Sequence, residues 1–138
     1  MATREQLQAL ALLKLREAEA LFEAGFFDGC AYLCGYVVEL PLKARICATL
    51  GVGEFPERLL KGAFRTHDFD DLKVLAGMEK EFSAASSNLL SNWSIASKWK
   101  PEWRSEPEGS YDRARAEKIL DAIRKKPDGV LACISSRW

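Results

Sequence analysis

The chain has 138 residues, a length that predicts one domain with a single hydrophobic core. Apolar residues make up 48% and charged residues 29%, and 20 basic side chains balance 20 acidic ones. This balance argues against a strong field that would draw the chain to nucleic acid or membranes. No apolar run reaches the roughly 18–20 residues of a membrane helix. Because no secretion signal is evident, we expect a cytoplasmic protein with no membrane partner.

Four cysteines, Cys30, Cys34, Cys47 and Cys133, are compatible with two disulfides, a metal site or free thiols. Cys30 and Cys34 fall one helical turn apart on an apolar face, where thiols behave as small hydrophobes. The chain has one histidine and no closely spaced ligand pairs in loops, as a zinc site would require. We therefore expect four free thiols, no bound metal and no cofactor.

The N-terminal half predicts an antiparallel helical hairpin. Thr3 and Gln6 have the spacing of a capping box, and apolar residues then recur at helical spacing as far as Gly25, a natural helix stop. A second helix is predicted to begin with Asp28 as its cap and to run to Leu50.

This second helix is apolar around most of its circumference, which is typical of a buried central helix. Its polar residues follow one stripe at helical spacing: Tyr32, Tyr36, Glu39 and Lys43. Glu39 and Lys43 have the acid-first spacing of a helical ion pair, which either fixes the helix position or lines a ligand groove. Pro41 lies inside the helix, and we expect a kink there.

The rest of the chain is predicted to be helical except for one long loop. The predicted helical segments are 55–61, 68–77 with a cap at Thr66 or Asp68, 79–97, 110–126 and a short helix within 127–138. The loop, 99–111, contains two prolines, a glycine and two tryptophans, and long ordered loops are often functional. The predicted fold is all-α, an up-and-down bundle of four main helices plus one or two short helices.

Three segments resemble the HEPN family: residues 24–28, the Glu-x-x-x-Lys of the central helix, and the His-Asp-x-x-x-Leu of residues 67–72. Arg104, after the fourth predicted helix, and Tyr111, at the head of the last long helix, are also similar to that family. The resemblance covers about residues 5–126. It implies a small helical bundle that forms dimers, with relatives in prokaryotic toxin–antitoxin, defence and RNA-processing systems, and a nucleotide-binding role.

Many HEPN proteins are metal-independent ribonucleases that use an arginine followed four to six residues later by a histidine. Here six residues separate Arg104 from Tyr111, and no histidine follows. The single histidine, His67, follows Arg65 by two residues and Arg58 by nine. Tyrosine, with a pKa of about 10, is a poor base at neutral pH. The nuclease motif is therefore absent or decayed, and Arg104, Tyr111 and His67 are catalytic candidates without a firm assignment.

Each of these candidates also has a structural interpretation. A histidine beside a helix cap commonly hydrogen-bonds a carboxylate, and the aspartates at 68, 70 and 71 suit a helix start better than a metal site. Trp99 and Trp103 either fix the loop to the bundle or stack on a base. Large aromatics at predicted helix ends, Phe26, Phe27, Trp99, Trp103 and Trp138, favour a homodimer.

Our first hypothesis is a non-catalytic dimeric binding module that acts with a partner protein, such as a nucleotidyltransferase-type or defence protein. It would contact nucleotide or RNA through Tyr32, Tyr36, Glu39, Lys43 and Arg104. The rival hypothesis is a divergent metal-independent endoribonuclease that uses Arg104 with Tyr111 or His67. A third class is a helical homodimer with an assembly role alone.

Overall fold

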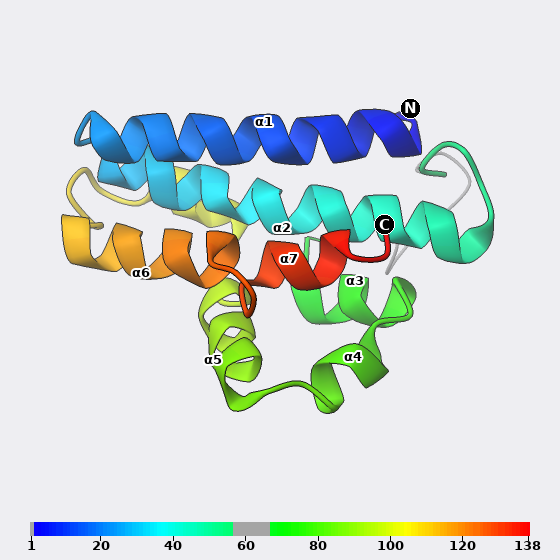
Figure 1. The fold of residues 1–138 in the computed structure, drawn as a ribbon. Coiled ribbons are helices and arrows are strands. Elements are labelled where there is room, and N and C mark those ends of the chain that lie inside the picture. Colours follow the sequence, from blue (N-terminus) through cyan, green and yellow to red (C-terminus); the bar gives the residue numbers. More distant parts are fainter. Residues whose placement is uncertain (1, 57–66) are drawn as a thin grey trace.

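The computed structural model describes residues 2–56 and 67–138, and every regular element in this part of the chain is a helix (Figure 1). An isolated β-bridge joins Thr3 and Glu54. The all-α prediction is confirmed. No helix among the described residues combines the length and the apolar character needed to cross a lipid bilayer. The elements are α1 (Arg4–Glu23), α2 (Phe27–Leu50), α3 (Phe69–Leu75), α4 (Glu79–Ser83), α5 (Ser87–Ala96), the 3-10 helix η2 (Pro101–Ser105), α6 (Arg113–Arg124) and α7 (Val130–Ser135).

Helices α1 and α2 form the predicted antiparallel hairpin along one side of the molecule (Figure 1). The capping box is present: the Gln6 amide donates to Thr3 Oγ1 at 3.1 Å, and the Thr3 amide donates to Gln6 Oε1 at 2.9 Å. Gly25 has a φ of 84°, a conformation that suits glycine, and it directs the chain from α1 into α2.

Helix α2 is the centre of the fold, with α1, α3, α6 and α7 all packed against it. Its 24 residues form one continuous helix across Pro41, and half of them are buried. Gly51, with a φ of 69°, ends the helix. The kink at Pro41 stays a prediction.

The helix predicted over 79–97 is wrong as one element, because the chain forms α4 and α5 with a break at Ala84–Ser86. The Ser86 hydroxyl accepts a hydrogen bond from the Leu89 amide at 3.2 Å and so begins a new helix. The break lets Phe82 and Trp93 pack together, with ring centroids 4.6 Å apart. The described chain thus has three short α-helices, more than the one or two predicted.

Two other predicted segments also need comment. The loop at 99–111 is not wholly irregular, because it contains the 3-10 helix η2. Of the turn predicted at 55–61, residues 57–61 lie outside the described residues, as does the Thr66 cap. The alternative cap is confirmed: Asp68 Oδ1 accepts from the amides of Asp70 and Asp71 at 2.9 and 3.1 Å.

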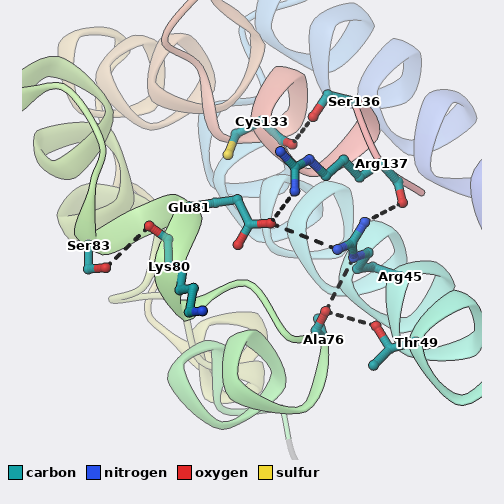
Figure 2. Close-up of polar contacts among 9 residues, drawn as sticks. All are labelled: Arg45, Thr49, Ala76, Lys80, Glu81, Ser83, Cys133, Ser136 and Arg137. Atoms are coloured by element: carbon teal, nitrogen blue, oxygen red, sulfur yellow. Dashed lines mark hydrogen bonds and ion pairs between the residues drawn. The ribbon is translucent and has the colours of Figure 1, made fainter.

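A polar cluster joins the C-terminal half of α2 to α4 and to the end of the chain (Figure 2). Arg45 donates to the carbonyl oxygens of Ala76, at 3.2 Å, and Arg137, at 2.6 Å. Glu81 Oε1 accepts from Arg137 at 2.8 Å and lies 3.9 Å from Arg45. Thr49 adds a second donor to Ala76 at 3.0 Å. These contacts hold together three segments that are distant in sequence, and no local sequence pattern indicates them.

Trp99 fixes the long loop to α2. Its side chain is 5% exposed, and its indole Nε1 donates to the carbonyl oxygen of Tyr32 at 2.9 Å. The ring stacks on Phe69 of α3, with centroids 5.5 Å apart. On the α2 side it lies against Gly35, where an added Cβ would stand 1.9 Å from the tryptophan ring. Only glycine leaves room for this contact.

We expect the Gly35→Ala variant to be destabilised by about 1–3 kcal/mol in urea unfolding, because the methyl group overlaps Trp99. A glycine-to-alanine change inside a helix ordinarily stabilises by up to about 1 kcal/mol, so a loss points to the steric contact. Gly53→Ala, which has open space around the added atom, is the control and should change little. In a Trp99→Leu background the cost of Gly35→Ala should shrink; an equal cost there would contradict the explanation.

Candidate functional site

The predicted polar stripe lies on one face of α2. The hydroxyls of Tyr32 and Tyr36 are 2.9 Å apart, and their rings meet edge to face with centroids 5.5 Å apart. One turn further on, Glu39 Oε2 lies 3.9 Å from Lys43 Nζ. Trp99 packs against both tyrosines, so the stripe sits beside the start of the long loop.

Glu39 anchors the segment that leads into α3. It is 3% exposed, and its Oε1 is hydrogen-bonded to Nδ1 of His67. Lys43, on the other side of Glu39, lies over the ring of Phe55 at 5.1 Å. The imidazole thus binds a carboxylate beside the cap of α3, as the structural interpretation of His67 predicts, while its catalytic interpretation stays untested. Both Glu39 oxygens face side chains of the protein, which leaves this acid little surface for a ligand.

Arg104 and Tyr111 line the same pocket, which has a volume of about 170 Å³. The pocket lies where the first turn of α2 meets η2 and the chain leading into α6. Tyr32 also lines it, so three predicted site residues come together here. His67 does not line this pocket. The complete lining is Asp28, Gly29, Tyr32, Trp103, Arg104, Glu106 and Tyr111.

Asp28 has a different role from the predicted helix cap. The cap of helix α2 lies two residues earlier, at Phe26, and makes no side-chain cap bond. The Asp28 carboxylate instead accepts hydrogen bonds from the amides of Gly109, at 2.7 Å, and Tyr111, at 2.9 Å. It thereby fixes the end of the loop, as Trp99 fixes its beginning. The prediction failed because the partners are more than 80 residues away.

Tyr111 is the buried wall of the pocket. It is 4% exposed, and its hydroxyl makes no hydrogen bond of good geometry with any residue in the described ranges. Burial raises the pKa of Tyr111 to about 12, with a further increase from the carboxylate of Glu106. Arg115, over the ring at 4.2 Å, has the opposite effect on this pKa. At neutral pH the phenol therefore keeps its proton and is a hydrogen-bond donor or acceptor, not a base.

The remaining pocket residues supply charge and a flat surface. Arg104 and Glu106 are exposed, and Trp103 is half-buried with its ring centroid 5.2 Å from that of Tyr111. Arg104 also lies close enough to Tyr36 to act on its pKa, which burial and the bond with Tyr32 raise to about 12. The positive charge of Arg104 therefore acts both in the pocket and on Tyr36 in the neighbouring stripe.

The cysteines lie outside this site. Cys30, Cys34 and Cys47 are buried, Cys133 is half-buried, and all four are free thiols in the structure. A hydrogen bond with Cys34 lowers the pKa of the Cys30 thiol and raises that of the Cys34 thiol. In the part of the chain that the structure describes, no three His, Cys, Asp or Glu side chains gather as a metal site would require.

Comparisons of the chain with protein-family models, with curated proteins and with solved structures give no match. The resemblance to the HEPN family therefore stays a sequence-based prediction.

We expect Asp28→Ala to release the end of the loop, because two backbone amides lose their acceptor. The cost should be about 1–3 kcal/mol in unfolding free energy, with faster hydrogen exchange at the Gly109 and Tyr111 amides. Asp28→Asn keeps one of the two acceptor oxygens, so its unfolding free energy and its amide exchange rates should lie between those of Asp28→Ala and the wild type. Unchanged exchange at both amides in Asp28→Ala would contradict this role.

The raised pKa values of Tyr36 and Tyr111, both about 12, predict a loss of stability at high pH. The folded pKa lies above the unfolded value of about 10, so the stabilisation is complete below pH 10 and disappears as the pH rises from 10 to 12. Absorbance near 295 nm during alkaline titration measures this, and Tyr111→Phe should remove one transition near pH 12. A Tyr111 phenol that ionises near pH 10 in the folded protein would refute the prediction.

Proposed function

We propose that this protein is a non-catalytic, dimeric, HEPN-like binding module that acts in the cytoplasm. Its partner would be a protein of the toxin–antitoxin or defence type, for example a nucleotidyltransferase-type protein. Its ligand would be a nucleotide or RNA, held in the pocket of Arg104 and Tyr111 and along the neighbouring stripe of Tyr32 and Tyr36. Glu39 and Lys43 would support this stripe from within.

One observation carries the proposal: Arg104 shares a pocket with a buried tyrosine whose pKa is about 12. Cleavage of RNA by its own 2′-hydroxyl needs a base near neutral pH and a cation for the phosphate. Arg104 provides the cation. The raised pKa of Tyr111, however, makes its phenol less available as a base at neutral pH than that of an ordinary tyrosine. The pocket is therefore better suited to holding a ligand than to cleaving it.

The pocket chemistry favours a ligand that combines a flat ring with a phosphate. Arg104 can form paired hydrogen bonds to phosphate oxygens, and the half-buried Trp103 offers a surface for stacking. The buried hydroxyl of Tyr111 makes no hydrogen bond of good geometry with a described residue, and a ligand oxygen or nitrogen would supply one. A volume of about 170 Å³ is small for a ligand site, so one group would enter while the rest lies across the surface.

A divergent metal-independent endoribonuclease is the second candidate, and the Glu39–His67 hydrogen bond favours it. A buried carboxylate that orients an imidazole is an arrangement found in general-base catalysis. The imidazole is half exposed and could reach a substrate. Against this candidate, His67 does not line the pocket of Arg104, so among the described residues these two side chains do not share that pocket.

The test is a binding and cleavage experiment with fluorescently labelled single-stranded RNA. We expect the RNA to be bound and to stay intact over hours at pH 7. Arg104→Ala should weaken binding about tenfold, the usual size for a lost charge-assisted hydrogen bond. Lys118→Ala, which removes an exposed positive charge from α6, is the matched control and should change affinity less than about twofold.

Two results would count against the binding module. Equal weakening by Arg104→Ala and Lys118→Ala would show that the pocket is not the binding site. Cleavage that disappears in Arg104→Ala and also in His67→Ala or Tyr111→Phe would establish the nuclease instead.

A further inference from the structure

Most of the aromatic residues that favour a dimer in the sequence are buried or half-buried. Trp99 is buried, and Phe27, Trp103 and Trp138 are half-buried, which leaves Phe26 alone strongly exposed, at 64%. Helix α1 instead carries three exposed large apolar side chains, Leu10, Leu12 and Leu13.

The outer face of α1 is apolar where a surface helix is ordinarily polar. Its inner face is buried against α2 through Leu7, Ala18 and Phe22. On the outer side Leu10 and Leu13 are each 38% exposed and help to line a groove of about 560 Å³. No described segment covers this side of α1, which forms the upper edge of the molecule in Figure 1. The groove is lined by Ala2, Gln6, Ala9, Leu10, Leu13 and Arg16.

The residues along this face alternate at spacings of four and three, the pattern of a helix that packs along another helix. Gln6, Ala9, Leu13 and Arg16 follow one another in this way. This pattern is symmetric about position 11. In an antiparallel pair with its twofold axis at that position, residue 6 meets 16 and residue 9 meets 13.

These pairings are complementary in size and polarity. The small side chain of Ala9 would face the large one of Leu13, and the amide of Gln6 would face the guanidinium of Arg16. On the flank of the stripe, the exposed Glu5 of one chain would lie beside the exposed Arg16 of the other. An acid near one end of a helix and a base near the other match only when the second helix runs in the opposite direction. A twofold axis produces this arrangement with two copies of one chain.

We propose that the outer face of α1 is the homodimer surface and that a second copy of α1 packs on it antiparallel. The inference rests on the dimer of the proposed function and names the surface that forms it. The residues of this surface are separate from those of the Arg104–Tyr111 pocket, so pairing and ligand binding can be tested independently.

The experiment is light scattering of the full chain at tens of micromolar, with helix content checked by circular dichroism. The wild type should have twice the chain mass of 15.5 kDa, and Leu13→Glu should have the single mass with helix content unchanged. Leu90→Glu, at a 44% exposed leucine on α5, is the control and should stay dimeric. Arg16→Glu should weaken the dimer at least tenfold, and the double variant with Glu5→Arg should recover most of that loss.

Three results would overturn the inference. A Leu13→Glu variant that is folded and still dimeric shows that the dimer forms through another surface. The dimer of the proposed function would then remain valid. A wild type of 15.5 kDa removes the second copy as the occupant of α1 and leaves this face to a different protein. A double variant, Arg16→Glu with Glu5→Arg, that dimerises no better than Arg16→Glu alone rejects the antiparallel arrangement. RNA affinity of Leu13→Glu, measured in parallel, reports on the pocket separately.

Discussion

The contact between Trp99 and Gly35 is the constraint on which the site depends. A large ring occupies space that any side chain at position 35 would fill, so the central helix and the loop must meet at this point. Phe69 stacks on the same ring, and both tyrosines of the stripe pack around it. The loop that carries Arg104 therefore starts from a fixed position, and α3 is held by the same side chain. Such a packed cluster transmits any change in volume, because protein interiors leave little free space.

Two acids on α2 complete the arrangement, and each binds a segment far away in sequence. Asp28 holds the amides of Gly109 and Tyr111, and Glu39 holds His67. Acids that are half or fully buried need such donors, because an unpaired carboxylate is costly away from water. Trp99 and Asp28 together fix the two ends of the loop, so the pocket between them is shaped before any ligand arrives. Preorganisation of this kind favours recognition, since little ordering is left for the moment of binding.

Local features of the fold could be predicted from the sequence, whereas contacts between distant segments could not. The capping box of Thr3, the glycine stops at Gly25 and Gly51, and the cap at Asp68 depend on neighbours a few residues away. The local sequence predicts Asp28 as a helix cap, whereas its carboxylate binds the amides of Gly109 and Tyr111, because a cap and a loop anchor look alike in the local sequence. The break between α4 and α5 follows from the packing of Phe82 on Trp93, and the Arg45–Glu81 cluster joins residues 36 positions apart. The approach of Arg104 and Tyr111 was suggested by a family resemblance and could not be read from spacing alone.

The protonation state of Tyr111 links the fold to the proposed function. Close packing around its ring keeps water away, and the nearby Glu106 adds a negative charge, so both effects favour the neutral phenol. A neutral hydroxyl beside an arginine can bind an anionic or polar group, but it cannot accept a proton from a ribose at neutral pH. To turn this pocket into a nuclease, the chain would need an imidazole at the place of the phenol. Its one histidine is instead held by Glu39, where it stabilises the junction of α2 and α3. The proposal of binding without cleavage therefore rests on how the core is packed around this pocket.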